Sequence, residues 1–152
     1  MGELIKRLRE TDLGSRELDL EIERLIYARD YRWVDPEKPH SGITYDKYEP
    51  GAVGNPVYWL PEYTNSLDDA IELTMSVLPE SKLKIEFDRT SFGEHIGWEA
   101  RISADYKTPW FSASHPFQPS IALIMAMLPI AESRGEIATH PKTREEWECL
   151  SG

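Results

Sequence analysis

The residues best suited to metal binding are scattered along the chain. The four histidines are His40, His95, His115 and His140. No two of them have the i, i+4 helical spacing or the short loop spacing of a metal site. His95 and His115 could still meet if their strands pair, with Glu94 or Asp105 completing a two-histidine, one-carboxylate site. We favour the simpler interpretation of separate, partly exposed histidines, and we predict no metal and no cofactor.

Nucleophilic chemistry has no stronger candidate. Cys149 is the only cysteine of the chain, and the neighbouring Glu148 opposes formation of its thiolate. No serine lies in a Gly-x-Ser-x-Gly elbow, and no Lys-Ser/Thr pair of a phosphate loop follows Gly51 and Gly54. The sequence therefore predicts no catalytic residue. A single cysteine also excludes an intrachain disulfide framework and a multi-cysteine zinc site.

The most distinctive segment is rich in aromatic residues and spans residues 30–62. Its prolines and glycines make a long helix or strand implausible, although a short strand pair at residues 43–48 and 57–60 is compatible with the pattern. Tyrosine and tryptophan suit a recognition surface or a small-molecule pocket. The same rings could instead cover the sheet or a helix as secondary core, and we favour this packing interpretation.

The candidate binding residues combine this segment with the acidic start of the helix that follows it. They are Tyr45, Tyr48, Tyr58, Trp59, Tyr63, Asp68 and Asp69. The two aspartates have a simpler explanation, because negative charge is favourable at the N-terminus of a helix. Ser66 with Asp69 three residues later also resembles a capping box.

Four helices are expected around this segment. An apolar stripe predicts one from Leu4 to Leu8, and a second begins after Ser15 as its N-cap. A third follows Ser66 and ends at Pro79, and a fourth opens at Pro119. The fourth helix contains an all-round apolar run from Ile121 to Leu128, which predicts burial on more than one side. We favour packing between a sheet and another helix, with a homodimer interface as the alternative.

Alternating apolar and polar residues predict three strands between the last two of these helices. They cover residues 83–87, 96–104 and 108–114, with a turn at 89–93, and their short connections indicate an antiparallel meander with one polar face. The fold class is therefore α+β, with the core order helix, three strands, helix. We predict one domain over residues 1–152: N-terminal helices at 1–29, the aromatic segment, a core at 63–131, and a tail at 132–152. A short terminal helix is expected after Thr143.

Length and charge limit the classes of function. The chain has 152 residues, 40% of them hydrophobic, and a formal net charge of −10. Such acidity opposes binding to nucleic acid and to anionic membranes. No signal peptide and no apolar run long enough to span a bilayer are visible, so we expect a cytoplasmic protein.

Several short motifs together suggest a family. They are Ser15-Arg-Glu-Leu-Asp19, the stretch from Pro61 to Ala70 with the sequence PEYTNSLDDA, a strand containing Trp98, and the apolar helix after Pro119. Together they resemble the phage ABA-sandwich domain proteins over roughly residues 15–131. The resemblance implies a three-layer α/β/α sandwich and a phage or prophage origin. It implies no activity and no catalytic residues.

The predicted core order also matches the double-stranded RNA-binding domain. Such domains hold phosphates with basic residues at the start of their second helix. The corresponding stretch here runs from Ser114 to Ser120 and contains no lysine or arginine. We therefore exclude this class.

The leading hypothesis is a non-catalytic phage or prophage accessory protein that binds another macromolecule. Its partner would be a host or phage protein, engaged through the aromatic segment or the acidic helix start. An alternative is a small-ligand binder or unrecognised hydrolase, with a pocket between the aromatic segment and the sheet. A third is a structural role through homodimerisation of the helix that contains residues 121–128.

Overall fold

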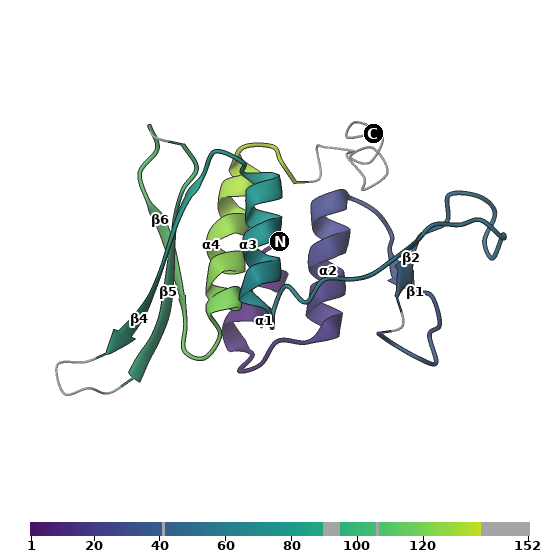
Figure 1. Cartoon of the computed structure of the whole chain (residues 1–152), viewed down its shortest axis with the longest axis horizontal. Helices are drawn as coiled ribbons and strands as arrows, with labels where there is room; N and C mark the ends of the chain where they lie inside the picture. Colours follow the sequence, from purple (N-terminus) through teal and green to yellow (C-terminus); the bar gives the residue numbers. More distant parts are fainter. Residues whose placement is uncertain (41, 90–94, 106, 138–152) are drawn as a thin grey trace.

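The computed structural model of the protein describes residues 1–40, 42–89, 95–105 and 107–137 (Figure 1). These residues form helices and antiparallel sheets, which confirms the α+β class. The helices are α1 (Gly2–Glu10), α2 (Arg16–Tyr27), α3 (Leu67–Val77) and α4 (Pro119–Ser133). The strands are β1 (Arg32–Trp33), β2 (Ile43–Thr44), β3 (Val57–Tyr58), β4 (Lys82–Arg89), β5 (His95–Ser103) and β6 (Phe111–His115). Within the described ranges, every helix falls short of the length and apolarity needed to cross a membrane.

The helices α2 and α3 start where the sequence predicts them. The Oγ atom of Ser15 accepts a hydrogen bond from the Leu18 N–H at 3.2 Å, and that of Ser66 accepts one from the Asp69 N–H at 3.2 Å. Each serine satisfies one of the N–H groups that the first turn of a helix leaves without a backbone partner. The helix α3 ends before Pro79, which has no N–H to continue it.

The strands β4, β5 and β6 form one sheet in that order, with an apolar face and a polar face. Leu83 lies opposite Ile102, and Ile85 lies opposite Ala100. Because successive side chains of a strand alternate between faces, the charged residues between them lie on the other side. Ile102 and Ala100 are fully buried and Trp98 is half-buried. The predicted antiparallel meander is confirmed, with its third strand at Phe111–His115 instead of residues 108–114. Residues 90–93 of the predicted turn lie outside the described residues.

The helix α4 forms the centre of the core. It packs against β5, β6 and α3, and less extensively against α1. Every residue from Ser120 to Leu128 is buried. This agrees with the expectation that an all-round apolar helix packs between a sheet and another helix. A single chain already buries the side chains from Ile121 to Leu128, and the alternative of a homodimer through this run stays a prediction.

Figure 1 shows the order of the layers. The β4–β5–β6 sheet lies at one end, α3 and α4 lie beside it, and α2 lies beyond them. The small sheet with β1 and β2 lies at the opposite end. All helices of the described residues therefore lie on one side of the larger sheet. The three-layer sandwich that the resemblance implies, with helices on both faces of a sheet, is not confirmed by this arrangement.

The aromatic segment contains the small antiparallel sheet, in the order β1–β2–β3. Ile43 pairs with Tyr58 and Thr44 with Val57, which is the short strand pair that the sequence allows. The strand β1 adds Trp33 opposite Ile43 and is not predicted. With two residues, it is too short for a period-two pattern to reveal it. The terminal helix predicted after Thr143 lies outside the described residues.

Candidate functional site

A cluster of tyrosines supports the small sheet from its inner side. The rings of Tyr31 and Tyr45 meet edge to face at 5.4 Å, and those of Tyr45 and Tyr58 stack at 6.1 Å. Tyr31 and Tyr45 are buried, and so is Tyr63, whose hydroxyl donates a hydrogen bond to the Glu23 carboxylate. Among the predicted binding residues, Tyr45 and Tyr63 are therefore core residues and Tyr58 is half-buried, as the packing interpretation expects.

Trp59 and Tyr48 are the predicted aromatic residues that reach the surface. Trp59 is 71% exposed and Tyr48 is 55% exposed. The chain at β3 is extended, so its side chains alternate between two faces. Tyr58 and Leu60 turn toward the core, whereas Val57, at 64% exposure, and Trp59 turn away from it. Trp59 thus points outward directly after β3, between two side chains that are held in the core.

A further apolar side chain joins Val57 and Trp59 on this outer face. Val34 and Val57 are neighbours across Gly42. A Cβ atom added to this glycine would lie 3.6 Å from Val57 Cγ1 and 3.7 Å from Val34 Cγ2. Val34 is 45% exposed. We call Val34, Val57 and Trp59 the Val–Trp patch. An exposed apolar group on a well-supported sheet is typical of a protein interaction site.

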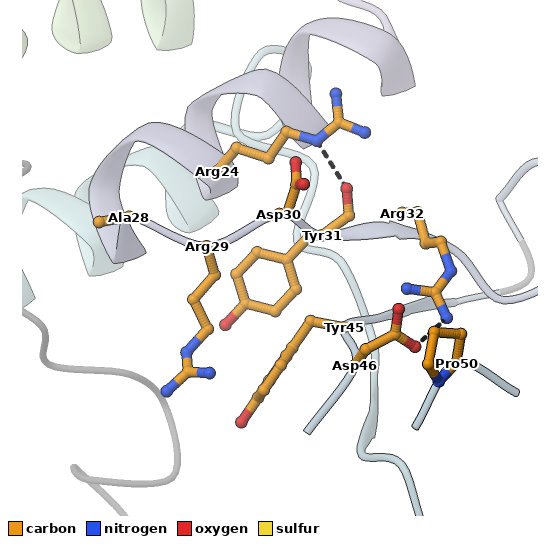
Figure 2. Close-up of a pocket in the computed structure, with 9 residues that line it drawn as sticks. All are labelled: Arg24, Ala28, Arg29, Asp30, Tyr31, Arg32, Tyr45, Asp46 and Pro50. Atoms are coloured by element: carbon orange, nitrogen blue, oxygen red, sulfur yellow. Dashed lines mark hydrogen bonds and ion pairs between the residues drawn. The ribbon is translucent and has the colours of Figure 1, made fainter. Parts of the chain in front are cut away.

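A pocket of about 710 Å³ opens between the C-terminal end of α2 and the small sheet (Figure 2). We call it the arginine pocket. Its lining residues are Arg24, Ala28, Arg29, Asp30, Tyr31, Arg32, Tyr45, Asp46 and Pro50. A second hollow of about 330 Å³ shares Arg24 and Arg32 with it and continues along α2. The arginines of this region are notable because the whole chain has a net charge of −10.

Each arginine of the pocket is held by a different contact, as Figure 2 shows. Arg24 donates from Nε to the Tyr31 carbonyl at 2.6 Å. Arg32 pairs with Asp46 at 2.6 Å, and the Arg29 guanidinium lies 4.1 Å from the centroid of the Tyr45 ring. The buried Nε of Arg29 has no hydrogen-bond partner among the described residues.

Guanidinium groups bind carboxylate and phosphate through paired N–H donors, so this pocket suits a small oxyanion. Its lining contains neither the serine, threonine or cysteine of a nucleophile nor the histidine of a general base among the described residues. The patch and the pocket adjoin, because Arg32 and Val57 lie on either side of Thr44 in the register of the small sheet.

A buried polar network fixes the chain just after Trp59. Asp19 is fully buried and accepts hydrogen bonds from the Thr64 N–H at 2.8 Å and the Thr64 hydroxyl at 2.7 Å. Its other oxygen pairs with Arg16 at 2.9 Å, and Arg16 also donates to the carbonyls of Leu60 and Pro61. Burial raises the pKa of Asp19, against the opposing effects of the Thr64 hydrogen bonds and the Arg16 charge.

The two aspartates predicted as binding residues lie on α3, away from the small sheet. Asp69 accepts a hydrogen bond from the Glu62 N–H at 2.8 Å, while its own N–H donates to Ser66. Asp68 is exposed in the first turn of the same helix. Ser66 is therefore the cap of α3, and the Asp69 carboxylate holds the chain before the helix at Glu62 instead of completing a capping box.

His115 serves the fold. Its Nδ1 accepts hydrogen bonds from the backbone N–H groups of Phe117 at 3.1 Å and Gln118 at 2.9 Å. Its Nε2 therefore carries the proton and donates to the Thr11 carbonyl at 2.6 Å. Because both ring nitrogens are occupied, the two-histidine, one-carboxylate site considered from the sequence does not hold for His115. The side chain of His95 lies outside the description.

Comparisons with known proteins return no match: no family model, no curated protein and no solved structure is similar to this chain. The resemblance to the phage ABA-sandwich domain proteins therefore stays a prediction. Sequence reasoning misses the arginine pocket, since it considers only aromatic and acidic candidates. The available signal is the placement of Arg24, Arg29 and Arg32 within nine residues of a strongly acidic chain.

Proposed function

We propose that this chain is a non-catalytic binding protein that recognises another protein through the Val–Trp patch. The observation that carries the proposal is the 71% exposure of Trp59 directly after β3, between Tyr58 and the buried Leu60. Tryptophan is enriched among the residues that dominate the energy of protein interfaces. A rigid support also reduces the ordering cost of binding, because little conformational freedom is lost.

The partner that fits this surface carries an apolar side chain next to a carboxylate. The apolar group would cover Trp59 and Val57, and the carboxylate would reach the adjoining arginine pocket. We further propose that the protein is a phage or prophage accessory protein that acts in the cytoplasm of its host. That part rests on the motifs shared with the phage ABA-sandwich domain proteins.

The test compares capture of host proteins by wild type and by a patch variant. The variant Val57→Ser/Trp59→Ser removes apolar surface without touching the tyrosine cluster. The matched control is Trp110→Ser, because Trp110 is also exposed, at 51%, and precedes a strand of the other sheet. We expect wild type and the control to retain the same partner, and the patch variant to retain about tenfold less or lower.

Thermal unfolding of all three proteins must first show that they are equally folded. Equal recovery of every partner by the patch variant and by wild type would contradict the proposal. Loss of a partner in the Trp110→Ser control alone would instead place the binding surface on the larger sheet.

A second candidate function is favoured by the arginine pocket, namely binding of a small oxyanion. This hypothesis predicts that inorganic phosphate or citrate shifts the amide resonances of residues 24–32 and 45–50 at concentrations up to about 10 mM. The variant Arg24→Ala/Arg29→Ala should abolish these shifts, and Arg101→Ala, on the larger sheet, should preserve them. Shifts of equal size in the double variant would exclude this site.

A further inference from the structure

The strand β4 forms an edge of the larger sheet, and its apolar face is incompletely covered. The helix α4 packs over β5 and β6, which leaves the β4 side of that face outside its main contact. On β5, Ala100 and Ile102 are fully buried. Their partners on β4, Ile85 and Leu83, are only half-buried, and Phe87 is 38% exposed. Apolar surface therefore remains beside an open strand edge, where another strand could cover it.

On the polar face of the same strand, two charged residues lie directly opposite like charges on the neighbouring strand. In the register of the sheet, Lys84 lies opposite Arg101, and Glu86 lies opposite Glu99. Like charges directly opposite each other on adjacent strands are destabilising. The opposite charges that do pair lie along each strand, Lys84 with Glu86 and Arg101 with Glu99. The free edge of β4 is thus the side from which a complementary charge could approach.

The sequence of β4 is complementary to itself when it is reversed. It begins with lysines at positions 82 and 84 and continues with acids at positions 86 and 88, while leucine, isoleucine and phenylalanine alternate with them. An antiparallel copy centred on Ile85 places Lys84 opposite the partner's Glu86 and Lys82 opposite the partner's Asp88. On the apolar face it places Leu83 opposite the partner's Phe87, and Ile85 opposite the partner's Ile85.

We propose that the chain forms a twofold-symmetric dimer through antiparallel pairing of β4 with β4 of a second copy, centred on Ile85. The two sheets become one continuous sheet of six strands, with the helices of both copies on the same face. A twofold axis perpendicular to the sheet produces this arrangement, because it keeps each face on its own side. The contact gives β4 the main-chain partner that an edge strand lacks.

Other registers of the same pair are disfavoured by the same charges. A slip of two residues in one direction places Lys84 opposite the partner's Lys84, and a slip in the other direction places Glu86 opposite the partner's Glu86. A slip of one residue puts apolar side chains on the polar face. The charges of β4 therefore disfavour pairing with most strands, and they favour one register with an identical strand. The remaining edge strand of this sheet, β6, has neutral serines at positions 112 and 114 and carries no such pattern.

Charge reversal and charge exchange test this dimer in sedimentation velocity over about 5–200 µM protein. We expect wild type to shift from monomer to dimer across this range. Lys84→Glu alone, and Glu86→Lys alone, should each weaken association about tenfold or more, because each creates two like-charge contacts across the axis. The double variant Lys84→Glu/Glu86→Lys should restore the dimer, since it exchanges the two charges and keeps every pair complementary.

The stability of each variant shows whether a loss of association comes from the interface or from a less stable monomer. Each single reversal replaces a like-charge pair within the sheet, with Arg101 or with Glu99, by an opposite-charge pair. Each reversal also removes the Lys84–Glu86 ion pair, so the two effects oppose each other. The folded monomer should therefore stay close to wild type in stability, as thermal unfolding of dilute samples will show. A wild type that stays monomeric to the highest concentration would overturn the proposal. So would single variants that dimerise as well as wild type, or a double variant that fails to recover.

Discussion

Asp19 shows how a single buried carboxyl group positions the candidate binding surface. Through Thr64 and Arg16, it fixes the two carbonyl groups that directly follow Trp59. Removing an ion pair partner from a buried network is costly, because the remaining groups lose their compensation. The sequence identifies neither this network nor its partners, since Thr64 lies 45 residues from Asp19 and only the fold brings them together.

The pKa of Asp19 leads to a prediction for stability as a function of pH. Because burial raises this pKa above its ordinary value of 3.8, the folded chain keeps a proton that the unfolded chain has released. In the window just above pH 3.8, the group therefore lowers the free energy of unfolding as the pH rises. We expect the free energy of unfolding of wild type, relative to that of Asp19→Asn, to fall as the pH rises above 3.8, measured by urea unfolding.

The pKa of Asp105 is shifted in the opposite direction to that of Asp19. Its pKa is lowered, chiefly by the hydrogen bond from the Lys107 N–H and further by Arg134. The stability that it contributes is therefore present above its ordinary pKa and is lost as the pH falls below that value. The difference between wild type and Asp105→Asn should rise with pH in the acid range. Equal slopes for the two variants would contradict at least one of these two pKa shifts.

At the scale of elements, local signals determine the helices well and the small strands poorly. The starts of α2 and α3 follow from Ser15 and Ser66, because a capping serine acts on residues immediately beside it. The period of the apolar residues likewise predicts β4 and β5. By contrast, β1 has two residues and exists because β2 pairs with it, which is a contact that no local pattern encodes. Long-range pairing therefore explains what the sequence does not predict in the aromatic segment.

The cap of α3 can be tested with a serine from the same helix as its control. Ser66→Ala removes the acceptor for the Asp69 N–H and should lower the free energy of unfolding by about 1 kcal/mol. Ser76 lies within the helix, where its hydroxyl donates to the Glu72 carbonyl. Ser76→Ala should leave stability unchanged or raise it slightly, because alanine has the higher helix propensity. Urea unfolding of the two variants distinguishes the outcomes, and an equal loss in both would contradict a capping role.

At the scale of the whole molecule, the net charge is negative, but one pocket gathers positively charged side chains. The chain carries a formal charge of −10, yet Arg24, Arg29 and Arg32 line one pocket. A total charge limits the class of partner by its long-range field, whereas an individual pocket selects a ligand at contact distance. The prediction that polyanions are not partners rests on this long-range field. The sequence could not reveal the pocket, because the end of α2 and the strands that enclose it meet only in the fold.

The position of α4 in the chain has a consequence for synthesis. This helix follows α1, α3, β5 and β6, and it is the common surface on which all of them pack. Proteins are made from the N-terminus, so the apolar faces of those earlier elements emerge from the ribosome before their shared partner does. The nascent chain therefore keeps these surfaces uncovered until α4 has also emerged from the ribosome.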